Sequence, residues 1–187
     1  MKASVQRVAD ALEQLGIQVE ITEFAESTRT AEEAAAAVNS TLGQIVKSLV
    51  FLAGEQPVLA LVSGTNRVDT DKLVAVAGGP IKRANADIVR EATGFSIGGV
   101  PPIGHTSSLP TYLDRDLLQY ELVWAAAGTP NAVFPITPDE LQRITGAAVV
   151  IIGAEVAIME EAPTMAGVTT VAVTTVVGII TNRTLSA

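Results

Sequence analysis

The chain has 187 residues, 48% of them hydrophobic, and this predicts one domain with a substantial core rather than a disordered chain. It contains no cysteine, which excludes disulfide bonds, zinc–thiolate sites and thiol catalysis and fits a reducing compartment. Twelve Lys and Arg against twenty Asp and Glu give a net charge of −8, which argues against wrapping along a DNA duplex.

The N-terminal residues alternate charged and apolar side chains, so they predict neither a signal peptide nor a membrane anchor. Apolar residues recur at helical spacing behind Ser4, a candidate N-cap, and predict a helix over residues 4–15. Residues 17–24 alternate apolar and polar side chains as a half-buried strand does. We therefore expect a cytoplasmic protein that begins with a helix and a strand.

Two threonines have the spacing of capping boxes, in which a hydroxyl and a glutamate three residues later bond each other's backbone. Thr30 with Glu33 opens a predicted helix over residues 31–39, and Thr137 with Glu140 opens another. The other expected elements are strands at 48–53, 58–64, 121–128 and 132–136 and short helices at 70–78 and 86–94. Helices and strands interleave, but a hairpin is among them, so we expect an α/β fold with a mixed sheet.

The C-terminal stretch from 164 to 180 carries no charged side chain over seventeen residues, close to the length that spans a membrane. Threonine, glycine and β-branched residues dominate it. This composition favours one or two strands, or an aggregation-prone extension, over a membrane span. We expect no membrane association and assign the tail no function.

Positive charge is concentrated in one part of the chain. Five of the twelve basic residues lie between residues 67 and 90, and they are Arg67, Lys72, Lys82, Arg83 and Arg90. Such runs usually form a solvated face, but a local basic patch is also what contact with nucleic-acid phosphates requires. Both interpretations remain open.

Lys47 stands among apolar residues at the start of a predicted strand, on the same face as Leu49 and Phe51. An ammonium group on a core-facing surface costs several kcal/mol unless it is paired or opens into a polar cavity. Lys47 therefore lies either at a functional site or at the solvated end of the strand, from which its head group extends into water.

His105 is the single histidine, so a multi-histidine metal site is excluded, and we expect neither a metal nor a cofactor. A lone loop histidine is more often a hydrogen-bonding residue than a catalytic base. The chain contains no GxSxG elbow and no GxxxxGK[ST] loop, which removes the usual anchors of serine hydrolases and nucleotide triphosphatases.

The stretch from Gly98 to Pro102 reads GGVPP. Glycines let a ligand approach the main chain, and prolines restrict the flanking backbone. Such a loop is either a rigid wall with backbone N–H donors or simply a tight connection between two elements.

Taken together, Lys47 in VKSLVF, DTDKLVAVAGG, the GxxxP spacing from Gly98 to Pro102, and the IGH and LPTYLD that follow resemble the YbaK/EbsC-type aminoacyl-tRNA deacylases. This group is also described as the prolyl-tRNA synthetase editing-domain (INS) superfamily. The resemblance spans about residues 1–150. It implies one deacylase domain over 1–150, followed by an apolar β-rich extension over 151–187 that matches nothing in the family.

The resemblance also implies a mixed α/β fold with a barrel-like central sheet and a pocket between sheet and loops. It implies hydrolysis of the ester of mischarged tRNA, alanyl- or cysteinyl-tRNA of the proline type, with prolyl-tRNA synthetase as a further partner. Lys47 and Gly98 match the family motif, and with Gly99 and Val100 they are the candidate catalytic positions. The candidate substrate-binding residues are Thr30, Pro102, His105 and Asn131.

An aminoacyl ester is already activated, so positioning a water and stabilising the oxyanion suffices without a covalent nucleophile. Two alternatives remain. A non-catalytic module of the same fold would bind aminoacyl-tRNA or a synthetase, and a small-molecule ester hydrolase would have a closed pocket without a basic rim.

Overall fold

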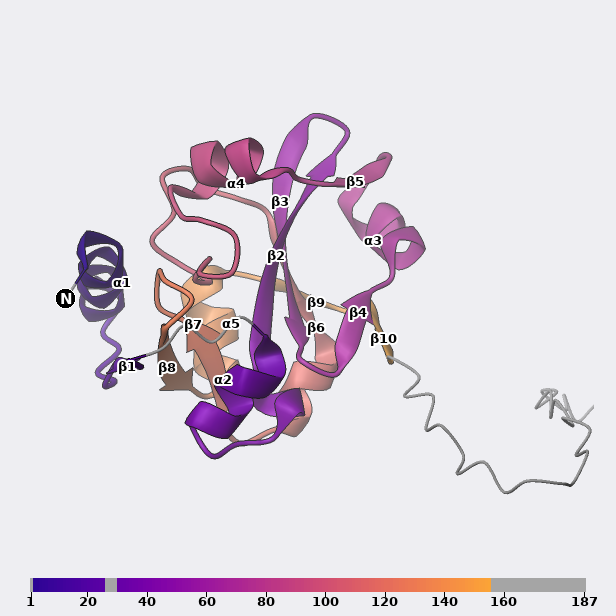
Figure 1. Cartoon of the computed structure of the whole chain (residues 1–187). Helices are drawn as coiled ribbons and strands as arrows, with labels where there is room; N and C mark the ends of the chain where they lie inside the picture. Colours follow the sequence, from indigo (N-terminus) through magenta and orange to yellow (C-terminus); the bar gives the residue numbers. More distant parts are fainter. Residues whose placement is uncertain (1, 26–29, 156–187) are drawn as a thin grey trace, which may run out of the picture. The chain divides into compact units, whose positions relative to one another are not determined.

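The computed structural model describes residues 2–25 and 30–155 (Figure 1). Helix α1 spans Ala3–Gln14 and buries one apolar face, as its spacing predicts. The predicted N-cap is wrong, because Ser4 lies inside the first turn and Lys2 takes the cap position without a side-chain hydrogen bond. The strand predicted over 17–24 is wrong in extent, since only β1 (Thr22–Glu23) pairs with another strand.

The following elements succeed β1 along the chain: α2 (Ala31–Ala37), the 3-10 helix η1 (Leu42–Gln44), β2 (Val46–Ala53), β3 (Gln56–Ser63), β4 (Asn66–Val68), α3 (Thr70–Ala77), β5 (Ile81–Arg83), α4 (Ala86–Thr93), β6 (Thr111–Asp114), the 3-10 helix η2 (Arg115–Gln119), β7 (Val123–Ala126), β8 (Ala132–Ile136), α5 (Pro138–Thr145), β9 (Ala148–Val150) and β10 (Gly153–Glu155).

The capping prediction holds fully at α2 and in part at α5. The Glu33 N–H donates to Thr30 Oγ1 at 3.1 Å, and the Thr30 N–H donates to Glu33 Oε2 at 3.3 Å. At α5 the Glu140 N–H donates to Thr137 Oγ1 at 3.3 Å, but the threonine hydroxyl, rather than its backbone, donates to the glutamate carboxylate. Both helices thus begin where the sequence predicts.

The main sheet has five strands in the order β5-β2-β3-β6-β9. β2 and β3 form the predicted antiparallel hairpin, from Val46 opposite Ser63 to Ala53 opposite Gln56. β6 and β9 add to it in parallel, so the sheet is mixed and the predicted α/β class is confirmed. The barrel-like expectation is corrected, because β5 and β9 are separate edges and the described strands do not close into a barrel.

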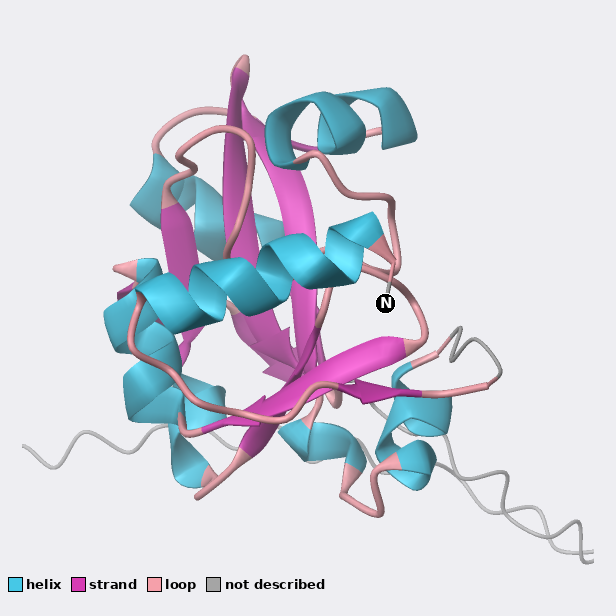
Figure 2. Ribbon diagram, turned by 90° about the vertical axis from the view of Figure 1, so that its left-hand side faces the viewer, coloured by secondary structure: helices cyan, strands magenta, loops and turns pink. Residues whose placement is uncertain are grey.

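Strand alternation gives the main sheet two buried faces. Leu59 and Leu61 of β3 pack in a cluster with the buried face of α1, which crosses in front of the sheet in Figure 2. Ala60 and Val62 belong to a second cluster together with Leu73 of α3. Because β3 is covered on both sides, it is the centre of the core.

Two smaller sheets complete the described part. β7 and β8 pair antiparallel, with β1 at the edge of β8, and β10 pairs with β4. Strand pairing therefore continues to Glu155, while the expected β-rich tail lies outside the described residues apart from its first few positions. Within the described ranges, no helix is long and apolar enough to cross a membrane.

Candidate active site

A pocket of about 270 Å³ lies beside the open edge of β2. β5 pairs only with residues 51–53 of β2, so no described strand pairs with residues 46–50 on the side that faces away from β3. The backbone contacts on that side are the hydrogen bond from the Ala84 N–H to the Val50 carbonyl and, just before β2, a bridge from Ile45 to Trp124. The lining combines this edge with α2, the loop at Gly98, and the turn between β7 and β8. Among the predicted site residues, those that line it are Thr30, Lys47, Gly98 and Val100.

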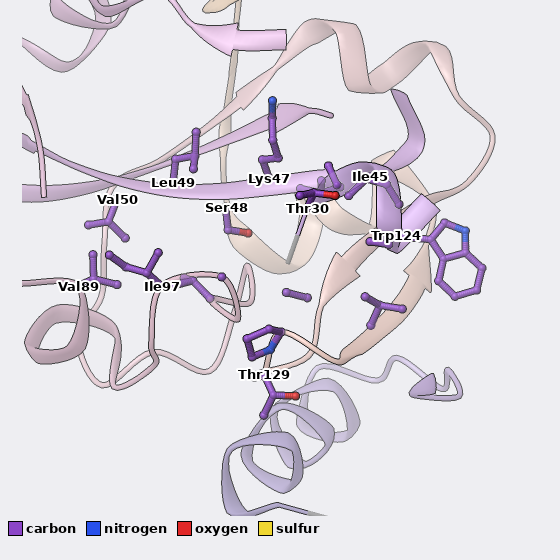
Figure 3. A pocket seen from close by; sticks show the side chains of 18 of the residues that line it. Thr30, Ile45, Lys47, Ser48, Leu49, Val50, Val89, Ile97, Trp124 and Thr129 are labelled. Carbon is purple, nitrogen blue, oxygen red and sulfur yellow. The ribbon is translucent and has the colours of Figure 1, made fainter. Parts of the chain in front are cut away.

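The strand divides the pocket wall into two faces, as Figure 3 shows. Lys47 and Leu49 project from one side of β2, and Ser48 and Val50 project from the other. The Val50 carbonyl accepts a hydrogen bond from the Ala84 N–H, so the backbone groups of even-numbered residues point to the open edge. A ligand in the pocket therefore meets a cationic face, a backbone edge and an apolar face.

The Lys47 ammonium group is fixed by backbone carbonyls. Its Nζ donates to the Gly64 carbonyl at 2.9 Å and to the Asn66 carbonyl. Burial lowers the pKa of Lys47, the Glu32 carboxylate partly raises it, and the Arg67 guanidinium lowers it further. Of the two interpretations that the sequence leaves open, a lysine at the pocket fits this half-buried, hydrogen-bonded position better than a solvated strand end.

A buried polar network stands behind this lysine. Asn66 Nδ2 donates to Asp114 Oδ2 at 2.9 Å and to Asp116 Oδ2 at 2.7 Å. Asp114 is fully buried, and its Oδ1 accepts the N–H groups of Ile152 at 3.2 Å and Gly153 at 3.0 Å. Because Asn66 also supplies a carbonyl to Lys47, the network fixes the turn on which the ammonium rests.

The Gly98 loop is placed by close packing. Gly98 has φ +89, a left-handed conformation that favours glycine. A Cβ on Gly99 would lie 2.6 Å from the Thr129 Cα, so only glycine lets the two backbones approach this closely. Gly98 and Val100 line the pocket, whereas Gly99 packs behind them against Thr129.

His105 does not line the pocket but contacts the backbone of this loop through a hydrogen bond. Its Nε2 lies 2.7 Å from the Pro101 carbonyl oxygen, and its ring meets the edge of Phe95 at 6.3 Å between centroids. The Arg7 guanidinium of α1 lies 3.8 Å from the centroid of the same Phe95. Burial lowers the pKa of His105, the Pro101 hydrogen bond partly raises it, and Arg7 lowers it further.

Two further candidates also lie outside the lining. Pro102 is buried in the loop, and Asn131 Nδ2 donates to the Phe24 carbonyl at 3.0 Å, which ties β8 to the segment after β1. Sequence reasoning missed Ser48, whose hydroxyl is buried without a hydrogen-bond partner in the described part of the chain and whose side chain points into the pocket. Its position next to Lys47 in an alternating strand was the signal that could have found it.

The basic cluster is divided between pocket and surface. Arg83 lines the pocket and Arg67 lies close enough to Lys47 to lower its pKa. Lys72 instead pairs with Asp69 at 3.7 Å. In the part of the chain that the structure describes, no group of three or more His, Asp or Glu side chains is arranged to hold a metal ion.

The family model for the aminoacyl-tRNA editing domain matches residues 25–144, which includes the lysine, the glycine loop and the whole pocket lining. The chain belongs to the aminoacyl-tRNA editing-domain family. This membership confirms the resemblance and the enzyme class, an aminoacyl-tRNA deacylase.

Curated relatives and solved structures agree with the family assignment. The chain is 34% identical over 127 residues to YwhH of Bacillus subtilis, which covers 67% of this chain and 81% of the relative. It is 28% identical over 124 residues to EbsC of Enterococcus faecalis, described as a candidate Cys-tRNA(Pro)/Cys-tRNA(Cys) deacylase, covering 65% of this chain and 76% of that one.

A crystal structure described as a candidate trans-editing enzyme for prolyl-tRNA synthetase is 52% identical, with a TM-score of 0.80. The match covers 82% of this chain and 99% of that one. A proline–tRNA ligase of Streptococcus equi is 28% identical over 110 residues, which are 58% of this chain but 18% of the ligase. The editing domain thus also resembles one part of a much longer synthetase.

Proposed function

We propose that the chain is a trans-editing enzyme that hydrolyses alanyl- or cysteinyl-tRNA of the proline type. The observation that carries the proposal is that Lys47 and the Gly98 loop line one pocket at the open edge of β2. A synthetase pocket built for proline cannot strongly reject a smaller amino acid, because a missing methylene is worth only about 1–3 kcal/mol. The names of EbsC and of the trans-editing neighbour support this substrate class.

The reaction needs no covalent nucleophile. A water oxygen attacks the ester carbonyl carbon, the tetrahedral oxyanion collapses, and the ribose oxygen leaves and takes up the proton. Backbone N–H groups of the loop at Gly98 and Val100 stabilise the oxyanion, since the Gly99 N–H already donates to the Ser96 carbonyl at 3.0 Å. The tRNA's own hydroxyl assists the attacking water. Lys47 holds the phosphate or ribose of the acceptor end, which its fixed ammonium group is suited to do.

Transfer RNA is bound through its acceptor end, with phosphate contacts from the basic residues nearest the pocket. Arg83 at the lining and Arg67 beside Lys47 support this over the small-molecule hydrolase, whose pocket would lack a basic rim. Single-stranded CCA ends are captured through few contacts, so an acidic net charge is compatible with weak, salt-sensitive binding. Prolyl-tRNA synthetase is the proposed partner that supplies the mischarged tRNA.

The test is deacylation of alanyl- and cysteinyl-tRNA(Pro), with correctly charged prolyl-tRNA(Pro) as the substrate control. Lys47→Ala should lower kcat/KM at least a hundredfold, since it removes the group that positions the acceptor end. Lys2→Ala removes an exposed lysine at the start of α1 and should leave turnover unchanged. Circular dichroism and thermal melting check that both variants fold.

Normal turnover by folded Lys47→Ala would overturn the role of the lysine. Failure of folded wild type to hydrolyse any of the charged tRNAs would overturn the enzymatic proposal. Measured tRNA binding would then favour the non-catalytic module.

A further inference from the structure

Ser48 presents an unused hydroxyl group to the pocket. Its Oγ is buried and has no hydrogen-bond partner among the described residues. A buried hydroxyl without a partner carries a desolvation cost that native proteins rarely leave uncompensated. In Figure 3 the side chain leaves β2 on the face opposite Lys47 and points into the pocket, so a bound ligand is the compensation that the geometry offers.

Three other polar side chains of the lining, those of Thr30, Lys47 and Thr129, are already engaged or point elsewhere. Thr30 caps α2, and Lys47 donates to two carbonyls. Thr129 also has an unpartnered hydroxyl, but in Figure 3 its side chain points away from Ser48, toward α1. Ser48 is thus the free hydroxyl on its face of the described pocket, where its neighbours Val50 and Ile97 are apolar.

The two faces of β2 suggest how a substrate would lie. The cationic groups, Lys47 and Arg83, suit the phosphate and ribose of the acceptor end, and the Gly98 loop suits the ester carbonyl. The remaining part of the substrate is the amino-acid side chain, and the remaining part of the pocket is the small apolar face around Ser48.

We infer that Ser48 is a specificity-determining residue, whose hydroxyl hydrogen-bonds the side chain of the aminoacyl group, so that the pocket selects small amino acids carrying a hydroxyl or thiol over alanine. The inference rests on the proposed function and changes its substrate class, because it favours cysteinyl over alanyl esters and adds seryl esters. An alanyl group enters the same space but lacks the Oγ or Sγ atom, so it leaves the Ser48 hydroxyl unpaired. One neutral hydrogen bond predicts a preference of about threefold to tenfold in kcat/KM.

The experiment compares seryl, cysteinyl and alanyl esters of one tRNA body with wild type and Ser48→Ala. Wild type should prefer the seryl and cysteinyl esters by about threefold to tenfold. Ser48→Ala should remove this preference by slowing the two polar substrates while alanyl-tRNA is hydrolysed as fast or faster. Ser107→Ala, an exposed serine outside this pocket, is the matched control and should keep the wild-type ratios.

Equal losses on all three substrates would overturn the inference, because they would mean that Ser48 acts on the attacking water or the shared α-amino group. Unchanged ratios would overturn it as well. Thermal melting distinguishes a structural role of Ser48 from a role in selectivity. If the hydroxyl has no partner in the free protein, Ser48→Ala should be at least as stable as wild type. A clear loss of stability together with proportional losses of turnover would reject selectivity.

Binding of non-hydrolysable amide analogues of 3′-seryl- and 3′-alanyl-adenosine separates this inference from the proposed function. One outcome is that wild type hydrolyses none of the esters and still binds the seryl analogue about threefold more tightly than the alanyl analogue, with the difference lost in Ser48→Ala. In that case the proposed catalysis fails and the selectivity stands. Equal binding of the two analogues by wild type and by Ser48→Ala would overturn the selectivity whether or not the chain is catalytic.

Discussion

The lysine side and the loop side of the pocket are held in place by different physical means. Lys47 rests on a turn that Asn66 and Asp114 fix through hydrogen bonds reaching the N–H of Gly153. The Gly98 loop is fixed by the contact of Gly99 with the Thr129 backbone. The Lys47 ammonium group is therefore positioned by hydrogen-bond partners. The backbone N–H groups of the Gly98 loop are positioned because Gly99 has no side chain to keep the two backbones apart.

This difference predicts opposite sensitivities. The lysine side should tolerate a change of shape but suffer from the loss of one donor, because each donor satisfies a buried acceptor. The loop side depends on the close approach of two backbones, so it should suffer most from one added methyl group. Three substitutions test this contrast.

Gly99→Ala should have the largest effect. The new Cβ would lie 2.6 Å from the Thr129 Cα and 2.7 Å from its carbonyl carbon, and backbone atoms cannot rotate away. We expect a loss of about 3 kcal/mol in the free energy of unfolding and at least a hundredfold loss of kcat/KM. Urea unfolding and deacylation measure the two quantities.

The control is Gly16→Ala. Gly16 has φ +75, but no atom of residues 2–25 or 30–155 outside its immediate chain neighbours lies within 4 Å of the place that an alanine methyl group would take. Only backbone strain therefore opposes the substitution, and about 1 kcal/mol should be lost. If Gly99→Ala were no more costly than Gly16→Ala, close approach would not be what holds the loop.

Asn66→Ala should have an intermediate effect. It deprives buried Asp114 of its side-chain donor and frees the turn that carries a carbonyl to Lys47. We expect about 2 kcal/mol of lost stability and about a tenfold loss of kcat/KM. Gln6→Ala removes an exposed amide from α1 and should change stability by less than about 0.5 kcal/mol. A variant of Asn66 that melts like wild type would show that the network does not support the lysine.

His105→Gln should have the smallest effect, visible in the pH dependence of stability. Because burial lowers the pKa of His105 below its ordinary value, the unfolded chain binds a proton more readily than the folded chain. Wild type should therefore lose stability as the pH falls below the ordinary histidine pKa of about 6.5, and this loss should be absent in His105→Gln. Melting temperatures across this pH range measure it, and parallel curves for the two proteins would contradict it.

The sequence predicts the elements whose signals are local. The hairpin of β2 and β3, the cap at Thr30 and the glycine ends of α3 and α4 follow from residues close in the chain. The parallel strands β6 and β9 do not, because four and three residues are too few to show alternation and their partners are far away in sequence. The open sheet edges follow from these pairings, so a barrel could not be rejected from sequence alone.

The site follows the same division. Lys47 is recognisable because a charged residue is unusual in an apolar strand. Gly98 is recognisable because glycines and prolines cluster in its loop. His105 and Asn131 stand near the loop or the strands in sequence, but each turns to a backbone carbonyl instead of lining the pocket. Ser48 is not conspicuous in the sequence, because a polar residue is ordinary in a strand of alternating pattern. Its hydroxyl faces a cavity only because β5 leaves part of the edge of β2 unpaired, which the sequence does not show.

The pairing of β10 with β4 determines where a minimal catalytic fragment can be cut. Every lining residue of the pocket lies before residue 144, at which the family match ends. A fragment trimmed to that boundary would keep the whole pocket in its sequence and still lose both N–H donors that Asp114 accepts. A truncated or grafted domain that ends where the family match ends would therefore lose activity because its fold is destabilised, although its pocket residues are intact. Fragments should extend through Gly153 to avoid this.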